Sequence, residues 1–143
     1  MTELDAYVVV QNAAIEALGV AAIVYGDFAS GPRTATDKGG PPTSRKIEPG
    51  DLLLLDFSVI VDGYRGDFTN TFAVGGPPTA RQRKLFEACV AALEAGESAL
   101  KPGAPARGVD EAVRAAFRAR GLEHAFTSHS GHGLGLGDRK SVV

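Results

Sequence analysis

The sequence has little cysteine and little net charge: among 143 residues there is one cysteine, and the formal net charge is −2. Cys89 falls on the apolar face of a predicted helix, where a cysteine typically packs in a core, and a lone thiol fits a reducing compartment. The Lys and Arg residues are scattered through predicted helices, so no basic stripe faces a phosphate backbone. The lack of a positively charged surface argues against a nucleic-acid partner.

Long hydrophobic runs are also missing. Residues 1–7 lack the basic region and following apolar stretch of a signal peptide, and the longest apolar runs are far shorter than the roughly 20 residues that span a bilayer. The 44% hydrophobic and 22% charged content is ordinary for one globular domain. We therefore predict a cytoplasmic protein with no membrane partner.

The pattern of elements predicts an α+β fold. Residues 5–17 have helical spacing and end at Gly19, and residues 20–25 are typical of a strand. Residues 26–51 are rich in Gly and Pro and predict a long loop, and residues 52–74 predict a hairpin. Two helices follow, so we expect a mostly antiparallel sheet with helices packed on one face.

Both later helices have clear sequence signals. Thr79 and Gln82 form a capping-box pattern for a helix that runs to about Leu100, and a second helix ends at Gly121. The expected apolar face of the first is Leu85, Phe86, Cys89, Val90 and Leu93, and that of the second is Val109, Val113, Ala116 and Phe117.

Asp56 and Asp67 stand on the two strands of the predicted hairpin, joined by the turn Asp62-Gly63. Asp-Gly between two β-rich runs is a strong hairpin signal, and it places Val61 opposite Tyr64. Asp56 and Asp67 then become diagonal neighbours on one sheet face, about 7–8 Å apart, within reach of one bridging cation.

Strand aspartates are also common on a solvated sheet face, and the hairpin alone leaves that alternative open. The run Leu52–Leu55, which leads into Asp56, predicts a strand buried on both faces. A buried acid must be protonated, paired or bound to a cation. We expect Arg65 on the opposite face, which leaves a metal or a shared proton.

A glycine-rich segment near the end contains His132 between Gly131 and Gly133. A phosphate loop of the form Gly-x-Gly-x-x-Gly fails because Leu136 stands where glycine is required. Imidazole is a common ligand of divalent transition metals, although a lone histidine is more often a structural or exposed residue. His129, three residues earlier, would face the opposite way on a regular strand.

Together these residues resemble the pita-bread metallopeptidase family, which includes aminopeptidase P, prolidase and the creatinase relatives. The resemblance covers roughly residues 20–137. It implies two divalent ions, Mn, Co or Zn, with Asp56, Asp67 and His132 as metal ligands and a metal-bridged hydroxide as nucleophile. It also implies a peptide substrate, with Xaa-Pro cleavage, and a homodimer of the intact protein.

The chain departs from the family pattern at the catalytic histidine and at its end. The histidine that the family usually has four residues before its histidine ligand would fall on Ser128, so His129 is the expected catalytic stand-in. Two glutamate ligands and a further histidine would follow where this chain stops, so residues 1–137 are predicted to be a partial, inactive catalytic domain. Residues 138–143 match nothing in the family, and their back-translation resembles a sequencing adapter, which predicts a non-native tail. A creatinase-type carbon-nitrogen hydrolase and a metal-free binding module stay as alternatives.

Overall fold

The computed structural model describes residues 1–35 and 39–134 in two compact units. The first, here called the sheet unit, contains Met1–Pro77 and residues 133–134. The second, the helical unit, is Pro78–His132. None of the helices in these described ranges is long and apolar enough to cross a membrane.

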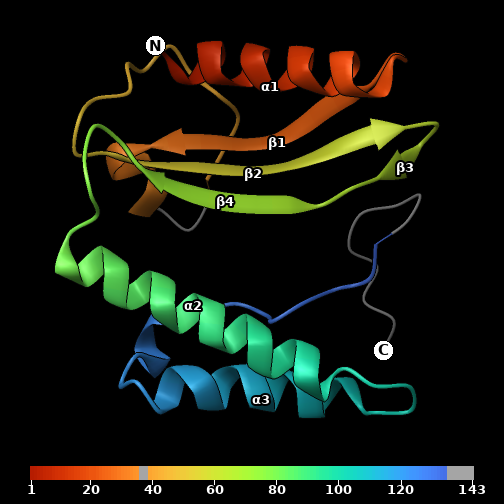
Figure 1. Cartoon of the computed structure of the whole chain (residues 1–143), viewed down its shortest axis with the longest axis vertical. Coiled ribbons are helices and arrows are strands. Elements are labelled where there is room, and N and C mark those ends of the chain that lie inside the picture. Colours follow the sequence, from red (N-terminus) through yellow and green to blue (C-terminus); the bar gives the residue numbers. More distant parts are fainter. Residues whose placement is uncertain (36–38, 135–143) are drawn as a thin grey trace. The chain divides into compact units, whose positions relative to one another are not determined.

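The sheet unit is an antiparallel sheet with one helix on it (Figure 1). Strand β2 is central, and it pairs with β1 on one side and with β3 and β4 on the other. The expected α+β class with an antiparallel sheet is confirmed. The elements are α1 (Glu3–Leu18), β1 (Ile23–Ser30), the 3₁₀ turn η1 (Gly31–Ala35), β2 (Leu52–Val61), β3 (Tyr64–Arg65) and β4 (Phe68–Ala73).

Helix α1 begins and ends at well-formed caps. The Thr2 Oγ1 accepts a hydrogen bond from the Asp5 N–H at 3.1 Å, and Asp5 returns one to the Thr2 N–H at 2.7 Å. Gly19, in the left-handed region at φ 66°, ends the helix as predicted. The apolar side of α1 then covers one face of the sheet, where Val24 and Phe28 are buried with Ala6.

Strand β1 is longer than predicted, because the sequence placed its end at residue 25 and the structure continues it to Ser30. Gly26, which suggested a loop, instead pairs with Phe57 inside the sheet. A Cβ at position 26 would lie 2.2 Å from the carbonyl oxygen of Asp56. Here glycine permits close approach of two strands rather than ending one.

The hairpin has the predicted register. Asp62 and Gly63 both have positive φ, at 50° and 84°, as a type I′ turn requires. Val61 pairs with Tyr64 and Asp56 with Thr69, so the register continues unchanged across the interruption between β3 and β4. The Gly66 N–H donates to the Val59 carbonyl at 2.9 Å within this interruption.

Strand β2 is not buried on both faces, and this expectation was wrong. All ten of its residues are half-buried. Leu55, Phe57 and Val59 pack with the α1 core, whereas the alternate residues point to the other face. The apolar run therefore reflects a central strand with one face packed on α1.

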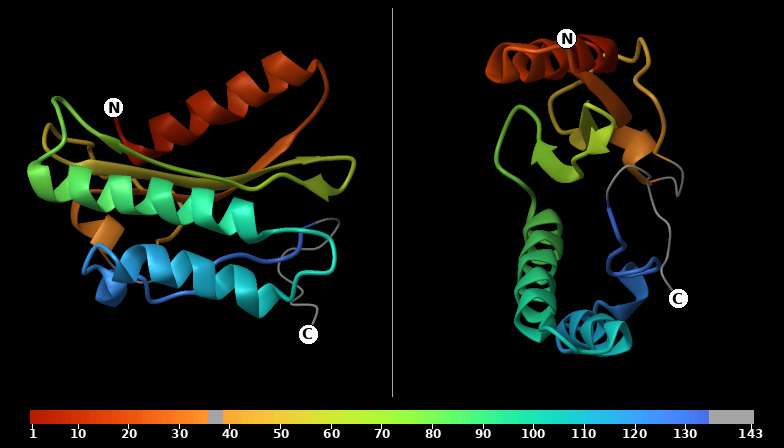
Figure 2. Two further views of the ribbon diagram at one scale, coloured as in Figure 1. Left: turned by 60° about the horizontal axis from the view of Figure 1, so that its bottom comes forward. Right: turned by 90° about the vertical axis from the view of Figure 1, so that its right-hand side faces the viewer.

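The helical unit pairs α2 (Ala80–Ala99) with α3 (Ala106–Arg118), followed by the 3₁₀ turn η2 (Glu123–Ala125). The two helices lie side by side in Figure 2. The capping box is confirmed, since Thr79 and Gln82 exchange hydrogen bonds of 2.7 and 3.3 Å. Val113 and Phe117 of α3 are buried at this contact, as their spacing predicted.

The buried face of α2 differs from the predicted one. Ala88, Ala92 and Gly96 face α3, and a Cβ on Gly96 would lie 3.0 Å from Cγ2 of Val113. Phe86 is 61% exposed, and Cys89 is also exposed rather than packed in a core. Small residues let the helices approach closely, so residue size rather than hydrophobicity selects the contact face.

Candidate metal-binding face

The sheet face opposite α1 carries the predicted acids, and we call it the aspartate face. Asp27 pairs with Asp56, and Asp56 pairs with Thr69, so these three form one row across the strands. Tyr25 pairs with Ser58, and the unbroken register places Asp67 opposite Ser58 in the next row. Asp56 and Asp67 are therefore diagonal neighbours on one face, as the sequence predicted.

A shallow pocket opens on the aspartate face and brings these side chains together. Asp56 is half-buried and Asp67 is exposed, so both carboxylates are within reach of a solvent ion. The residues that line the pocket are Tyr25, Gly26, Asp27, Asp56, Phe57, Ser58, Arg65 and Asp67.

Thr69 orients one of the two acids. Its Oγ1 donates a hydrogen bond of 2.8 Å to Oδ1 of Asp56 from the adjacent strand. Such a bond restricts the orientation of the carboxylate and uses only its Oδ1 atom. Partners of this kind commonly orient the carboxylate ligands of metal sites.

Arg65 lies on the aspartate face, which corrects its predicted position on the opposite face. It pairs with Ile60 and lies two residues before Asp67, so the alternation of side chains along the strands puts all three on the same side. Its guanidinium carbon lies 5.6 Å from the centre of the Tyr25 ring. The pocket thus contains a cation beside its acids.

Asp27 and Tyr25 are pocket residues that the sequence reasoning missed. Both lie on β1, which was predicted to end at residue 25, and Asp27 was assigned to a loop. Continuing the alternation of β1 through Gly26 would have placed Asp27 beside Asp56. The alternation of side chains along β1 therefore indicated this position, but Gly26 was interpreted as the start of a loop.

The segment that carries the histidines is held against α3 in the helical unit. The Ser130 Oγ donates to Oδ1 of Asp110 at 2.8 Å, and Arg114 donates to the Ser128 carbonyl at 3.0 Å. Arg114 also lies over the ring of Phe126, 5.0 Å from its centre. Hydrogen bonds from Arg114 and then Ser130 hold the pKa of Asp110 below its usual range.

His129 and His132 are both exposed, and their rings lie close together. The ring centres are 5.8 Å apart in an edge-to-face arrangement, so the expectation that they face opposite ways was wrong. The segment is not a regular strand, and the two-residue alternation does not apply to it. Within residues 1–35 and 39–134, no three His, Cys, Asp or Glu residues form a group that could hold a metal ion. The joint role of Asp56, Asp67 and His132 stays a prediction.

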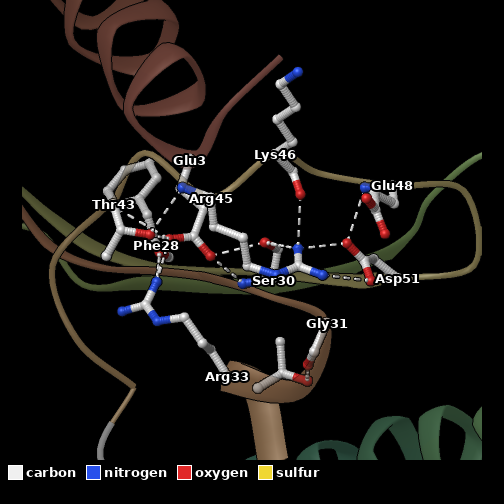
Figure 3. A network of polar contacts seen from close by, with 11 residues as sticks. Glu3, Phe28, Ser30, Gly31, Arg33, Thr43, Arg45, Lys46, Glu48 and Asp51 are labelled. Carbon is white, nitrogen blue, oxygen red and sulfur yellow. Dashed lines mark hydrogen bonds and ion pairs between the residues drawn. The ribbon is translucent and has the colours of Figure 1, made fainter.

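A second acidic residue of the sheet unit, Glu3, is buried and surrounded by hydrogen-bond donors (Figure 3). Its carboxylate is fully buried and accepts hydrogen bonds from the backbone N–H groups of Ser30 and Thr43, at 2.8 and 3.0 Å. The hydroxyls of both residues donate as well, at 2.7 and 2.6 Å, and Arg33 forms an ion pair with it. Every oxygen is engaged, so this acid ties α1 to β1 and to the loop before β2.

The Glu3 centre connects to an ion pair in the same loop. Arg45 donates to the Ser30 hydroxyl at 2.6 Å and to both carboxylate oxygens of Asp51, at 2.6 and 3.1 Å. Burial raises the pKa of Glu3, but the hydrogen bonds from Thr43 and Ser30 outweigh it and hold the pKa below its ordinary value. The network fixes the chain immediately before β2, which carries Asp56.

Comparison with known proteins finds similarity to metallopeptidases, which is consistent with a metal site on the aspartate face. The model of metallopeptidase family M24 matches residues 1–141. Over 109 residues the chain is 34% identical to an Xaa-Pro dipeptidase of Pyrococcus furiosus, covering 76% of this chain and 31% of that protein. It is 30% identical over 114 residues to an uncharacterized peptidase of Staphylococcus saprophyticus, covering 80% of this chain and 31% of that protein.

Solved structures show the same architecture. The prolidase of Pyrococcus horikoshii OT3 has a TM-score of 0.74 at 31% identity, covering 80% of this chain and 32% of that one. An Xaa-Pro dipeptidase of Bacillus anthracis has a TM-score of 0.74 at 30% identity, covering 82% of this chain and 32% of that one. The predicted pita-bread resemblance is confirmed, and the chain spans about a third of the length of the relatives it matches.

Proposed function

Because the chain belongs to metallopeptidase family M24, we propose that Asp56, Asp67 and His132 are three of five ligands of a two-ion centre that hydrolyses Xaa-Pro peptide bonds. The observation that carries the proposal is the diagonal placement of Asp56 and Asp67 on one sheet face, lining one pocket. Relatives of this chain are named Xaa-Pro dipeptidases, which supports a substrate with proline after the scissile bond.

The donor set suits hard or borderline divalent ions. Two carboxylates and one imidazole favour Mn, Co or Zn, because carboxylate oxygens and imidazole nitrogen are common ligands of these metals. Two such ions, when bound, polarise a carbonyl and lower the pKa of water, so hydroxide becomes available near neutral pH. Thr69 keeps Asp56 in a fixed orientation for this role.

His129 is the proposed catalytic residue of the helical unit. Its ring is exposed and touches the ring of His132, so it can reach a substrate beside a metal ligand. There it would donate a hydrogen bond to the substrate or to the developing oxyanion. The hydrogen bonds of Asp110 and Arg114 to the segment hold its backbone in place for this contact.

We further propose that residues 1–137 are the first part of a catalytic domain whose remaining ligands lie on a longer protein. The chain by itself would bind metal weakly and would not turn over substrate, and the intact protein would be a cytoplasmic homodimer. Residues 138–143, outside the described residues, would be a non-native tail. Resequencing the source gene tests this, and coding sequence that continues through residue 143 would refute the tail.

The peptidase proposal is favoured over the two alternatives. The named relatives are peptidases, which supports peptide cleavage rather than hydrolysis of a creatine-like substrate. Both carboxylates expected in this part of the site are present and adjacent, which argues against a metal-free binding module.

The test is metal analysis and hydrolysis by the full-length protein that carries this sequence. Purified protein should contain about two divalent ions per chain and cleave Ala-Pro. Asp67→Asn should lose both properties, whereas Glu16→Gln, a charge change on exposed α1, should keep them. An empty site in an active protein, or activity retained by Asp67→Asn, would contradict the proposal.

A further inference from the structure

Arg114 on α3 contacts the part of the chain that carries His129 and His132, here called the histidine segment and defined as residues 126–132. Its Nε donates a hydrogen bond of 2.7 Å to Oδ2 of Asp110, one helical turn earlier. Its Nη2 donates to the Ser128 carbonyl at 3.0 Å, and its guanidinium carbon lies 5.0 Å from the centre of the Phe126 ring. Arg114 thus joins an acid of its own helix to two residues of the histidine segment.

Asp110 adds a third attachment. Its Oδ1 accepts a hydrogen bond of 2.8 Å from the Ser130 hydroxyl, while its Oδ2 binds Arg114. Phe126 in turn stacks on Phe117 of the helical core, with ring centres 4.9 Å apart. The residues of α3 that make these contacts are one and two helical turns apart and share one face of the helix. That face holds the histidine segment at every second residue from Phe126 to Ser130.

His129 lies between two of the held residues. Arg114 binds the carbonyl oxygen of the peptide group that joins Ser128 to His129. The next residue, Ser130, is bound through its side chain. An exposed segment without such contacts would sample many backbone conformations. The two hydrogen bonds therefore restrict the direction of the His129 ring, whose centre lies 5.8 Å from that of the His132 ring.

The Asp110–Arg114 ion pair contributes little to the helix itself. The side chains of Asp110 and Arg114 are 36% and 34% exposed, and screening by water leaves such pairs a small net stabilisation. Arg118 forms similar ion pairs on the same helix with Glu111 and Glu123, which lie outside the histidine segment. Because the two arginines differ in what they attach, comparing them separates the position of the segment from the stability of the helix.

We propose that Asp110 and Arg114 are positioning residues that orient His129 beside His132 for catalysis. The inference rests on the proposed function, in which His129 donates a hydrogen bond to the substrate or to the developing oxyanion. Such a donor stabilises the transition state when it is already in place, and a displacement of about 1 Å can lower the rate about 100-fold. Arg114 therefore acts through His129 rather than on the substrate.

The first test observes the two histidine rings of this chain by nuclear magnetic resonance, without metal or substrate. Wild type should show a nuclear Overhauser effect between the imidazole protons of His129 and His132, since the ring centres are 5.8 Å apart. Arg114→Met should lose this effect and keep the wild-type melting temperature, whereas Arg118→Met should keep both. An effect that persists in a folded Arg114→Met variant, or that is absent from wild type, would overturn the inference.

Ser130→Ala is a milder second variant, because it removes one hydroxyl and leaves the ion pair in place. It should weaken the effect between the two rings. Arg114→Lys should weaken it as well, because lysine keeps the charge and lacks the planar donor edge. Should Arg114→Met melt far below wild type, Ser130→Ala decides the question, and an unchanged effect between the rings in that variant would overturn the inference.

The second test separates positioning from a purely structural role, with the full-length, metal-loaded protein and Ala-Pro as substrate. Arg114→Met should lower kcat about 100-fold with KM close to that of wild type, because a misplaced His129 fails in the transition state rather than in substrate binding. In a His129→Ala background the same substitution should cause no further loss. Arg118→Met should leave kcat unchanged. Losses that multiply in the double variant would show that Arg114 acts independently of His129 and would overturn the inference.

Failure of the proposed function gives a different result. Full-length wild type that binds metal and does not cleave Ala-Pro, or a His129→Ala variant with full activity, would contradict the proposed function. The effect between the two rings in Arg114→Met would still decide whether Arg114 positions His129.

Discussion

The carboxylate of Glu3 and those of Asp56 and Asp67 lie on opposite faces of one sheet and differ in what surrounds them. Glu3 is fully buried, and three residues supply hydrogen bonds or an ion pair to both of its oxygens. Asp56 is half-buried with a hydrogen bond from Thr69, and Asp67 is exposed. The first acid is therefore committed to the fold, whereas the second pair is accessible to a cation from solvent.

The largest expected effect is on the fold and comes from Glu3. Glu3→Ala should lower the free energy of unfolding by about 3–5 kcal/mol. The variant leaves the donors of Ser30, Thr43 and Arg33 without the carboxylate that they bind. Urea denaturation followed by circular dichroism measures this. Asp67→Ala should lower the same quantity less, because Asp67 is exposed. Similar losses at both positions would remove the distinction between the two acids.

Gly26 lies on β1 where this strand closely approaches the backbone of β2 at Asp56 and Phe57. Gly26→Ala should cost about 1–3 kcal/mol, the range for inserting a methyl into a packed site, since its Cβ would meet backbone atoms of β2. Gly76→Ala is the control, because no heavy atom lies within 4 Å of a Cβ there. Equal thermal stability of the two variants would show that β1 does not approach the backbone of β2 closely at Gly26.

The Thr69 hydroxyl is expected to matter for metal binding on the aspartate face, because it donates a hydrogen bond to Asp56. Thr69→Val removes the hydroxyl that orients Asp56 and should weaken Mn²⁺ binding about tenfold, with little change in melting temperature. Calorimetric titration of the full-length protein measures the affinity. Thr71→Val, two residues farther along the same strand, should leave it unchanged. An unaltered affinity in Thr69→Val would show that the hydrogen bond does not position a ligand.

The smallest expected effect is on the pH dependence of stability. The folded-state pKa of Glu3 lies below its ordinary value of 4.5, so its contribution to stability is complete above about pH 4.5. That contribution is lost as the pH falls through the lowered folded-state pKa. Glu3→Gln should therefore lose less stability than wild type between about pH 5 and pH 3. Parallel curves for the two proteins would exclude this role for Glu3.

Local signals explain what the sequence predicted well. The turn at Asp62-Gly63 determines the register of the hairpin, and the register alone brings Asp56 and Asp67 to one face. Caps at Thr79 and Gly19 were likewise predicted, because each depends on residues within one turn of the helix.

Contacts between distant segments explain what the sequence did not predict. Gly26 is in a strand only because β2 lies beside it, and Glu3 is an anchor only because Thr43, 40 residues away, reaches it. The small residues of α2 face α3 because the helices approach closely, which hydrophobic spacing does not reveal. Arg65 was misplaced by an error in strand parity that the pairing with Ile60 corrects.

The most direct test of the aspartate face is Mn²⁺ titration of this chain, followed by calorimetry or by the electron paramagnetic resonance of free Mn²⁺. We predict weak, saturable binding in wild type that is lost in Asp56→Asn and in Asp67→Asn, while both variants keep the wild-type melting temperature. Glu16→Gln, on the outer surface of α1, should bind as wild type does. Saturable binding that persists in Asp67→Asn, or a folded wild type that binds no Mn²⁺, would contradict the account.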